Sequence, residues 1–329
     1  MTETFAAYRI FGDATKSTSR FTRMRESELD EGDLLIETSY ANIQYKDALA
    51  ATGTSGVVRR FPMVGGTDVA GVVLKSGDPR HSPGDRVAVL SHGLGETHNG
   101  GYAELVRVPG SWALPIPDGL DDESAMAIGS TGLTVALVLH RLEAQGITPE
   151  SGPVAVTGAT GGVGSMAIDL LARRGYEVVA ISGKPDAVGY LRELGASEVL
   201  PREVYTLEKR ALGAGRWGAA IDNVGGDALS WLLRTTRNNG AVAAVGNTGG
   251  TEVHTSVFPF ILRGVTLLGI NAAIFDPQLR AELWQRLAGD LRPAHLADIT
   301  QVIPFAELPS MFDRFLSSEV RGRIVVKIR

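Results

Sequence analysis

The sequence contains no cysteine among its 329 residues. This absence excludes disulfide bonds, a cysteine nucleophile, zinc sites with thiolate ligands and iron–sulfur clusters held by cysteine. Any redox chemistry in this chain would therefore need a cofactor that binds without such ligands.

Excess positive charge and long hydrophobic runs are also missing. Lys and Arg total 32 against 37 Asp and Glu, which gives a net charge of −5; nucleic acids and anionic membranes instead bind strongly basic surfaces. The longest nearly apolar stretch, Met126 to Leu139, is shorter than the roughly 20 residues that span a bilayer, and the N-terminus lacks a signal-peptide pattern. We expect a cytoplasmic protein with neither nucleic acid nor membrane as a partner.

Length and composition predict two globular domains. About 330 residues correspond to roughly two domains, and 44% apolar with 21% charged residues is close to the globular average. The first third consists of short β segments separated by Gly, Pro and Asp turns, which predicts a β-rich domain over residues 1–120. These β segments are residues 34–38, 69–74, 86–90 and 102–108.

From Asp121 onward a helical stretch is followed by alternating strand and helix patterns, which is typical of βαβ units around a parallel sheet. Six apolar runs fit the strands of a doubly wound sheet over residues 121–294. The runs are residues 154–157, 178–182, 198–200, 219–222, 241–245 and 266–268. The closing β run, Gly322 to Lys327, is expected to rejoin the first domain, together with the chain from about residue 295 to 329. The predicted fold class is therefore α/β, with a β-rich domain and a doubly wound parallel sheet.

The strongest local motif is a glycine-rich turn between an apolar strand and a helix. Glycines permit a tight turn and a close approach of the backbone to a pyrophosphate, while the helix N-terminus offers free N–H groups. This context predicts a dinucleotide site rather than a turn without a ligand. The residues expected to contact the dinucleotide are Thr157, Gly158, Ala159, Thr160, Gly161, Gly162 and Val163.

The end of the second strand predicts which dinucleotide binds. NAD-specific sites carry an acidic residue about 20 positions beyond the glycines, where it binds the ribose 2′-hydroxyl. Here the strand ends in Ser182, Gly183 and Lys184, and a hydroxyl beside a cation suits a 2′-phosphate. NADPH is favoured, although nearby Asp186 keeps NAD open and these residues could also form a solvated turn.

A turn that contains asparagine and glycine follows each of two later strands of the predicted sheet. Asn223 and Val224 come after one strand, and Gly246 and Asn247 after the next. Ligands of doubly wound folds bind outside the carboxyl ends of the strands. We expect these four residues to flank the nicotinamide half of the cofactor, the alternative being simple connecting turns.

Taken together, the glycine turn, the β-rich first domain and the returning C-terminal strand resemble the medium-chain dehydrogenase/reductase superfamily over almost the whole chain. The resemblance implies a GroES-like domain packed on a Rossmann domain, with the active site in the cleft between them. Four segments resemble the acrylyl-coenzyme A reductase group, whose members are often labelled quinone oxidoreductases. These segments are residues 44–49 (QYKDAL), 58–63 (VRRFPM), 93–98 (GLGETH) and 320–323 (VRGR).

The group resemblance implies a zinc-free, NADPH-dependent reductase of an activated carbon–carbon double bond, usually a homodimer. Zinc enzymes of the superfamily carry a Gly-His-Glu segment, and the matching residues here are Gly66, Thr67 and Asp68. The six histidines show no metal-ligand spacing of the H-E-x-x-H type. We expect no metal.

The same resemblance suggests site residues outside the glycine turn. Tyr45 is the candidate proton donor or oxyanion donor. Water is the alternative proton donor, and in that case the Tyr45 ring would only pack in the domain. Lys46 and Asp47 are expected to form an ion pair or to orient the nicotinamide ribose. Arg323 is predicted to reach a cofactor phosphate or the substrate carbonyl. Asn271 is placed near the cofactor.

Two further features carry open alternatives. Thr131 is predicted to bond the nicotinamide side of the cofactor, unless it only caps a helix. Arg59 and Arg60 would either attract coenzyme A phosphates or face solvent.

The predicted reaction is hydride transfer from NADPH to the β-carbon of an enoyl thioester or enone, a small-molecule substrate. A donor near the carbonyl oxygen is required because negative charge develops there. Reduction of quinones at the same NADPH site is the close alternative, and a non-catalytic NADPH-binding protein is the alternative of another class.

Overall fold

The computed structural model describes residues 4–13, 16–53, 56–206 and 210–329, and the chain divides into two compact units. Unit 1 comprises residues 1–130, 276–288 and 300–329, and unit 2 comprises residues 131–275 and 289–299. The first boundary therefore falls ten residues after the predicted one. Residues 276–288 join unit 1 because Arg280 and Trp284 bond to the carbonyl oxygens of Leu90 and Pro115.

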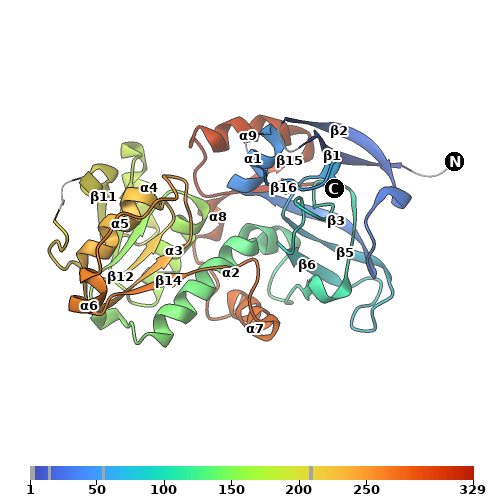
Figure 1. The fold of residues 1–329 in the computed structure, drawn as a ribbon. Coiled ribbons are helices and arrows are strands. Elements are labelled where there is room, and N and C mark those ends of the chain that lie inside the picture. The colour runs from blue at the N-terminus through green and yellow to red at the C-terminus, as the bar shows by residue number, and fades with distance from the viewer. Residues whose placement is uncertain (1–3, 14–15, 54–55, 207–209) are drawn as a thin grey trace. The chain divides into compact units, whose positions relative to one another are not determined.

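Unit 1 is built on two β-sheets (Figure 1). The larger has the strand order β15-β16-β3-β5-β6-β8, with β7 also paired to β3, and the smaller has the order β2-β1-β4. Strand β16 pairs antiparallel with β3, so the C-terminal run belongs to this unit. The strand bounds are β1 (Thr4–Gly12), β2 (Ser17–Arg25), β3 (Leu34–Ile43), β4 (Met63–Val64), β5 (Asp68–Ser76), β6 (Arg86–Leu90), β7 (Leu105–Val108), β8 (Ala113–Pro115), β15 (Thr300–Pro304) and β16 (Arg323–Lys327).

Helices α1 (Tyr45–Thr52), α7 (Pro277–Ala288) and α9 (Leu308–Leu316) lie wholly in unit 1. Helix α9 is strongly amphipathic and packs against α1. Its Met311 and Phe312 join a core with Tyr8 and Tyr102. This packing fixes the position of α1, whose first turn carries the candidate residues Tyr45 to Asp47.

Unit 2 contains the predicted doubly wound parallel sheet. Its strand order is β11-β10-β9-β12-β13-β14, and every pair in it is parallel. The order reverses between β9 and β12, which is the switch point where ligands of such sheets bind. The strand bounds are β9 (Val154–Thr157), β10 (Val178–Ser182), β11 (Glu198–Pro201), β12 (Trp217–Asp222), β13 (Thr236–Ala244) and β14 (Thr266–Gly269).

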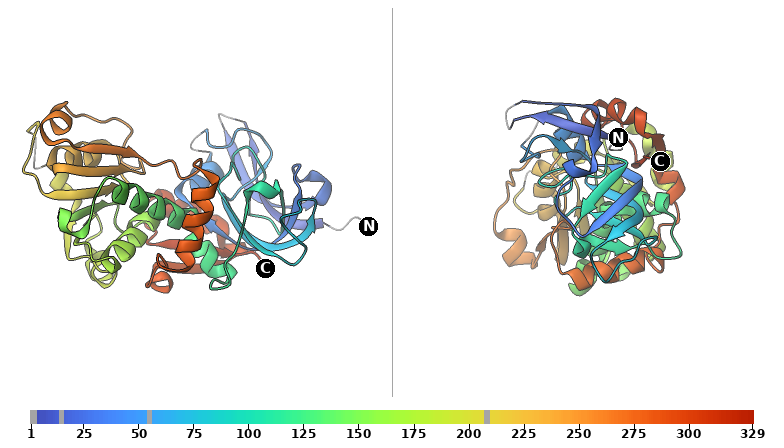
Figure 2. Two further views of the ribbon diagram at one scale, coloured as in Figure 1. Left: turned by 90° about the horizontal axis from the view of Figure 1, so that it is seen from below. Right: turned by 90° about the vertical axis from the view of Figure 1, so that its right-hand side faces the viewer.

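Short helices connect these strands (Figure 2). Helix α3 packs against β9 and β10, and α5 packs against β12 and β13. The apolar face of α5 contributes Trp231 and Leu232 to a buried cluster with Trp217. The helix bounds in unit 2 are α3 (Gly162–Arg173), α4 (Val188–Glu193), α5 (Gly226–Thr235), α6 (Phe258–Arg263) and α8 (Leu296–Ile299).

Helix α2 (Asp122–Ala144) carries the chain from unit 1 into unit 2 and breaks at Gly129, whose φ of 49° and ψ of −157° are not helical. A side chain at Gly129 would overlap the amide of Asn42. By length and composition α2 could cross a membrane, but 83% of its most apolar stretch is buried in the protein, as in a core helix.

Candidate functional site

The predicted glycine turn follows β9 and leads into α3. Gly158 has a φ of +56°, in the left-handed region that favours glycine. A Cβ on Gly164 would overlap the carbonyl oxygen of Gly158, so only glycine lets the helix approach the turn so closely. Gly161 is exposed and precedes the first residue of α3, where the free N–H groups of a helix end can bind an anion.

The end of β10 lies beside a cation that the sequence reasoning missed. The Ser182 hydroxyl oxygen accepts a hydrogen bond from the Lys184 backbone N–H at 3.0 Å. A Cβ on Gly183 would lie 2.8 Å from Cδ of Arg202, so the exposed Arg202 side chain lies against this turn. Two cations and a hydroxyl therefore gather where a 2′-phosphate is expected.

Arg202 could have been found from the strand order. Ser182 pairs with Pro201 in the parallel ladder between β10 and β11, so the residue after Pro201 lies at the same sheet edge as Lys184. The sequence motif describes only the first two strands of the sheet. The residue after the third strand lies outside this motif.

Side chains at the ends of β9 and β12 form a hydrogen-bonded group at the switch point. The Thr157 hydroxyl donates to Oδ1 of Asp222 at 2.6 Å and accepts from the Asn223 backbone N–H at 3.0 Å. Nδ2 of Asn223 donates to the Thr157 carbonyl oxygen at 2.8 Å. Burial raises the pKa of the Asp222 carboxyl above its usual value.

This group corrects one expectation. Thr157 is fully buried and its hydroxyl is used by Asp222 and Asn223. Thr157 therefore supports the site from within the sheet, in place of the direct cofactor contact that the motif predicted. Ala159 and Thr160 are also buried, which leaves Gly161, Gly162 and Val163 as the more accessible residues of the turn.

The turns after β12 and β13 pack closely together. The backbone N–H groups of Val245 and Gly246 both donate to the Asp222 carbonyl oxygen, at 2.8 and 3.2 Å. A side chain at Gly246 would overlap the Asn223 carbonyl oxygen. Val224 and Asn247 come from the same pair of turns, and Asn247 is exposed. The four residues predicted for the nicotinamide half therefore lie close together in these two turns.

These residues fit a dinucleotide. The glycines leave the backbone bare where a Cβ would fill the turn, and a cationic pair lies at the end of β10. In addition, Oδ1 of Asn223 is buried and has no hydrogen-bond partner within the described residues. A ligand donor at the switch point would satisfy this oxygen.

Tyr45 is the first residue of α1, and its side chain is 38% exposed. The preceding residue, Gln44, is the N-cap of the helix, and its amide donates to the Ser130 hydroxyl at 2.7 Å. Tyr45 thus lies at a helix start and is exposed, as a proton donor to a bound substrate requires.

The structure corrects the expected role of Asp47. This residue is 4% exposed and caps α1: its Oδ2 accepts from the Gln44 N–H at 2.8 Å, and its Oδ1 accepts from the Thr67 hydroxyl at 2.6 Å. Burial is the main cause that raises its pKa to about 6. Lys46 pairs with Glu96 at 2.7 Å instead of with Asp47. Asp47 therefore caps the helix that carries Tyr45.

Arg323 is also placed differently from the expectation. It is 3% exposed, and its Nε and Nη2 donate to the carbonyl oxygens of Ala127 and Met126 at 3.1 and 3.4 Å. Such burial does not fit direct contact with a substrate carbonyl or a cofactor phosphate. The resemblance identified an arginine near the final strand but could not show that its guanidinium points inward.

The remaining candidates are distributed between the units. Thr131 is 6% exposed and begins unit 2, directly after Ser130, whose N–H donates to Asp68 at 2.8 Å. Asn271 is exposed in unit 2, and its Oδ1 accepts from the backbone N–H groups of Ala273 and Ile274 in a local turn.

Arg59 and Arg60 are both exposed in unit 1. The guanidinium of Arg60 makes a bidentate contact to Asp30 at 2.6 and 2.8 Å, so its charge is already balanced. Arg59 is held through its backbone, whose N–H donates to the Glu96 carbonyl oxygen at 2.9 Å. Of the pair, Arg59 is therefore better suited to attract a phosphate.

Two histidines, His92 and His98, lie in the loop after β6. The His92 ring stacks on Trp112 with centroids 5.3 Å apart, and His98 bonds to the Arg107 carbonyl oxygen at 2.7 Å. Burial is the main cause that lowers the pKa of His92 to about 4. In the part of the chain that the structure describes, no three His, Asp or Glu residues are grouped so that they could hold a metal ion.

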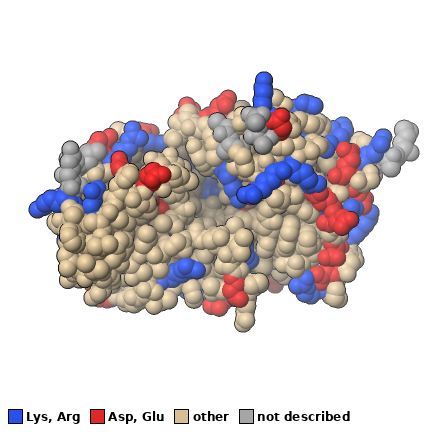
Figure 3. All heavy atoms as spheres, in the orientation of Figure 1, with Lys and Arg blue, Asp and Glu red and all other residues tan. Residues whose placement is uncertain are grey.

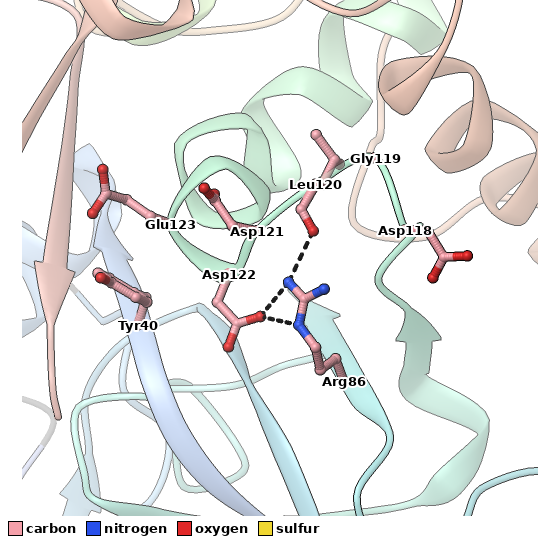
Figure 4. Close-up of a pocket in the computed structure, with 8 residues that line it drawn as sticks. All are labelled: Tyr40, Arg86, Asp118, Gly119, Leu120, Asp121, Asp122 and Glu123. Atoms are coloured by element: carbon pink, nitrogen blue, oxygen red, sulfur yellow. Dashed lines mark hydrogen bonds and ion pairs between the residues drawn. The ribbon is translucent and has the colours of Figure 1, made fainter.

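A surface pocket in unit 1 lies around Arg86 (Figure 4). Arg86 donates to Asp122 at 2.6 and 2.8 Å and to the Leu120 carbonyl oxygen at 2.9 Å. Asp118, Asp121 and Glu123 also line the pocket. Because carboxylates surround an arginine that is already paired, the pocket is poorly suited to a phosphate-bearing ligand.

Two family models match the chain. The model described as alcohol dehydrogenase GroES-like domain matches residues 30–118, and the one described as zinc-binding dehydrogenase matches residues 162–288. The chain belongs to the medium-chain dehydrogenase/reductase superfamily. The GroES-like domain and the Rossmann-type parallel sheet are thus confirmed.

Two relatives are similar over their full lengths. A Bacillus subtilis protein provisionally named quinone oxidoreductase YhfP is 42% identical over 330 residues, which cover 100% of both chains. An Escherichia coli K-12 protein provisionally named acrylyl-CoA reductase AcuI is 42% identical over 313 residues, covering 95% of this chain and 96% of the relative.

Solved structures agree with this assignment. The E. coli K-12 YhdH structure with bound NADPH superposes with a TM-score of 0.95 at 41% identity, covering 98% of this chain and 100% of that one. The B. subtilis YhfP structure with bound NAD gives the same TM-score and identity, with coverage of 99% and 100%.

Proposed function

We propose that this chain is an NADPH-dependent reductase of activated carbon–carbon double bonds, with an acrylyl-CoA type enoyl thioester as its substrate. Membership of an oxidoreductase family, relatives of this name and a related structure with NADPH support the proposal. The cofactor assignment rests on two features found together: the glycine turn after β9, and Ser182, Lys184 and Arg202 at the end of β10.

The bound cofactor would supply a hydride to the β-carbon of the substrate. The residues of the chain have the remaining tasks, which are to hold the dinucleotide, to stabilise charge on the carbonyl oxygen and to deliver a proton to the α-carbon. Tyr45 is the proposed donor because it carries a titratable hydroxyl and is exposed at the start of α1. Lys46 would lie next to it, held by Glu96.

Quinone reduction is the second candidate, and the name of the YhfP relative favours it. It would use the same cofactor turn, with NADPH or NADH as the reductant, since the YhfP structure holds NAD. A quinone carries no phosphate, so this activity would not need the exposed Arg59.

A panel of acceptors distinguishes these functions. NADPH and NADH oxidation would be measured with acrylyl-CoA, with an uncharged enone and with a simple quinone. The proposal predicts the highest kcat/KM for acrylyl-CoA with NADPH. Turnover of the quinone alone would favour the second candidate, and tight NADPH binding with no turnover would indicate a non-catalytic binding protein.

We propose further that the protein is a homodimer joined through unit 2. Large apolar side chains are exposed along residues 257–274, and charged groups are sparse over α6 and β14 (Figure 3). Among the described residues β14 pairs with β13 alone, so its other edge could pair with a second copy. The exposed side chains are Val257 (60%), Ile261 (68%), Leu262 (61%), Leu267 (41%) and Ile274 (80%).

Light scattering after gel filtration tests the dimer. Ile261→Asp should convert the wild-type dimer to a monomer, because a charge would be buried in the interface. Val188→Asp is the matched control on α4 and should leave the mass unchanged. A monomeric wild-type protein would contradict the proposal.

The cytoplasm is the proposed compartment, as the absence of cysteine suits a reducing environment. Fractionation of cells that produce the native protein checks this, with recovery in a periplasmic or membrane fraction as the contradicting result.

A further inference from the structure

We propose that Asp222 is a positioning residue which, through the Thr157 hydroxyl and the Asn223 backbone N–H, holds residue 223 where the Thr157 carbonyl oxygen orients its side-chain amide, with the amide oxygen toward the cofactor. The site then selects a hydrogen-bond donor on the nicotinamide nucleoside half of the dinucleotide. This inference rests on the proposed NADPH site and adds a residue to it. Its basis is the hydrogen-bonded group at the ends of β9 and β12.

The orientation of the Asn223 amide follows from its partner. Nδ2 lies 2.8 Å from the Thr157 carbonyl oxygen, which can only accept a hydrogen bond. If the amide were turned over, Oδ1 would face this oxygen and the two acceptors would repel each other. The nitrogen is therefore held by the Thr157 carbonyl oxygen, and the amide oxygen is the atom left without a partner among the described residues.

The orientation of the Thr157 hydroxyl is determined in the same way. Its oxygen accepts from the Asn223 backbone N–H at 3.0 Å, so its proton is directed to Oδ1 of Asp222 at 2.6 Å. Asp222 also accepts from the backbone N–H of Gly225 at 2.8 Å. An ionised carboxylate accepts from all these donors at once, whereas an asparagine would present its own N–H₂ to one of them.

Asp222 is fully buried and has no ion-pair partner in the described ranges. A buried carboxylate without a cation is costly, so its hydrogen bonds must offset its desolvation. Through its bonds to the backbone N–H groups of Val224 and Gly225, Asp222 fixes the conformation of the turn from Asn223 to Gly225 at the switch point.

These hydrogen bonds leave one acceptor atom without a partner. Oδ1 of Asn223 is buried without a partner among the described residues, and Gly158 of the cofactor turn lies against the same side chain, since its Cβ would be 3.2 Å from Cβ of Asn223. Leaving a buried acceptor unpaired is unfavourable until a donor binds. The nicotinamide nucleoside carries two kinds of donor, the ribose hydroxyls and the carboxamide N–H₂.

Binding measurements test the inference without catalysis. Dissociation constants for NADPH, from its fluorescence, and for 2′,5′-ADP, by calorimetry, would be compared in wild type, Thr157→Val, Thr157→Ser and Asp222→Asn. We expect NADPH to bind about tenfold more weakly to Thr157→Val and Asp222→Asn. The fragment, which lacks the nicotinamide nucleoside, should bind all four proteins equally, and Thr157→Ser should retain NADPH affinity.

A second comparison identifies the donor. Asn223→Ala would be titrated with NADP⁺ and with its 3-acetylpyridine analogue, which lacks the carboxamide N–H₂. A loss for NADP⁺ alone would assign the carboxamide as the donor, and an equal loss for both would assign a ribose hydroxyl.

Three results would overturn the inference: NADP⁺ affinity unchanged in Asn223→Ala, NADPH affinity unchanged in Thr157→Val, or an equal weakening of NADPH and 2′,5′-ADP. The last would mean that the group only supports the fold, and melting temperatures of the variants would show this directly. If wild type failed to bind 2′,5′-ADP, the proposed NADPH site itself would be wrong.

Discussion

Asp68 and Arg323 stabilise opposite sides of the break in α2 at Gly129. The Asp68 carboxylate accepts from the Ser130 N–H, at the start of the second helical segment, while the Arg323 guanidinium donates to the last carbonyl oxygens of the first segment. Helix starts favour negative charge and helix ends favour positive charge. Each charge therefore compensates the helix end that the break exposes.

Replacement of Arg323 should accordingly affect stability more than cofactor binding. Arg323→Met would remove a buried cation that interacts electrostatically with Asp68 and would leave the Ala127 and Met126 carbonyl oxygens without this donor, so we expect a loss of about 1–3 kcal/mol in the free energy of unfolding by urea. Arg321→Met, two residues earlier and exposed, is the control and should change stability by less than about 0.5 kcal/mol. If Arg323→Met had normal stability but had lost NADPH affinity, this would instead support the direct contact between Arg323 and the cofactor that the sequence predicted.

The cationic pair at the end of β10 should determine the choice between NADPH and NADH. Lys184→Ala and Arg202→Ala should each raise the KM for NADPH about tenfold or more, because each removes a charge-assisted contact to the 2′-phosphate. The KM for NADH should change little. Arg192→Ala, on α4, is a control for loss of positive charge. Equal effects on both nucleotides would refute the phosphate contact.

Tyr45→Phe should lower kcat for acrylyl-CoA reduction roughly 100-fold, with a smaller change in KM, if the hydroxyl acts in the transition state. Steady-state kinetics would be compared with Tyr40→Phe, which removes a hydroxyl from β3 beside the acidic pocket. An unchanged kcat would leave water as the proton donor.

Asp47 gives a prediction about pH. Because its folded pKa is raised from 3.8 to about 6, ionisation favours the unfolded chain, and Asp47 destabilises the fold increasingly as the pH rises through this range. Lys46 and Asp68 act on the same carboxyl and are unchanged in the variant. Asp47→Asn should therefore gain about 1 kcal/mol relative to wild type between pH 5 and pH 7, as measured by urea unfolding. A difference between the two proteins that did not vary with pH would contradict this ionisation.

The sheet of unit 2 could be predicted from the sequence because its strands β9, β10 and β12 are buried on both faces and appear as apolar runs. Strand β9 and strand β10 have the predicted bounds. Strand β2 was missed, since its residues Ser17–Arg25 are mostly polar and it lies at the edge of a small sheet. Its pairing with β1 is a tertiary property that no local pattern reveals.

Site residues were predictable where the backbone itself provides the chemistry. The glycine turn is determined by a local motif, so its position was found from the sequence. Asp47 and Arg323 were misjudged because their roles depend on burial, which arises from elements distant in the chain. Arg202 was missed for a related reason, because only the pairing of β11 with β10 places it beside the end of β10, the second strand in chain order.

Isotope transfer tests the central claim most directly. The protein would be incubated with acrylyl-CoA and NADPH deuterated at the transferable C4 position, and the product analysed by mass spectrometry and NMR. The account predicts propionyl-CoA with one deuterium on the β-carbon. Absence of NADPH oxidation, or a product without deuterium at that carbon, would contradict it.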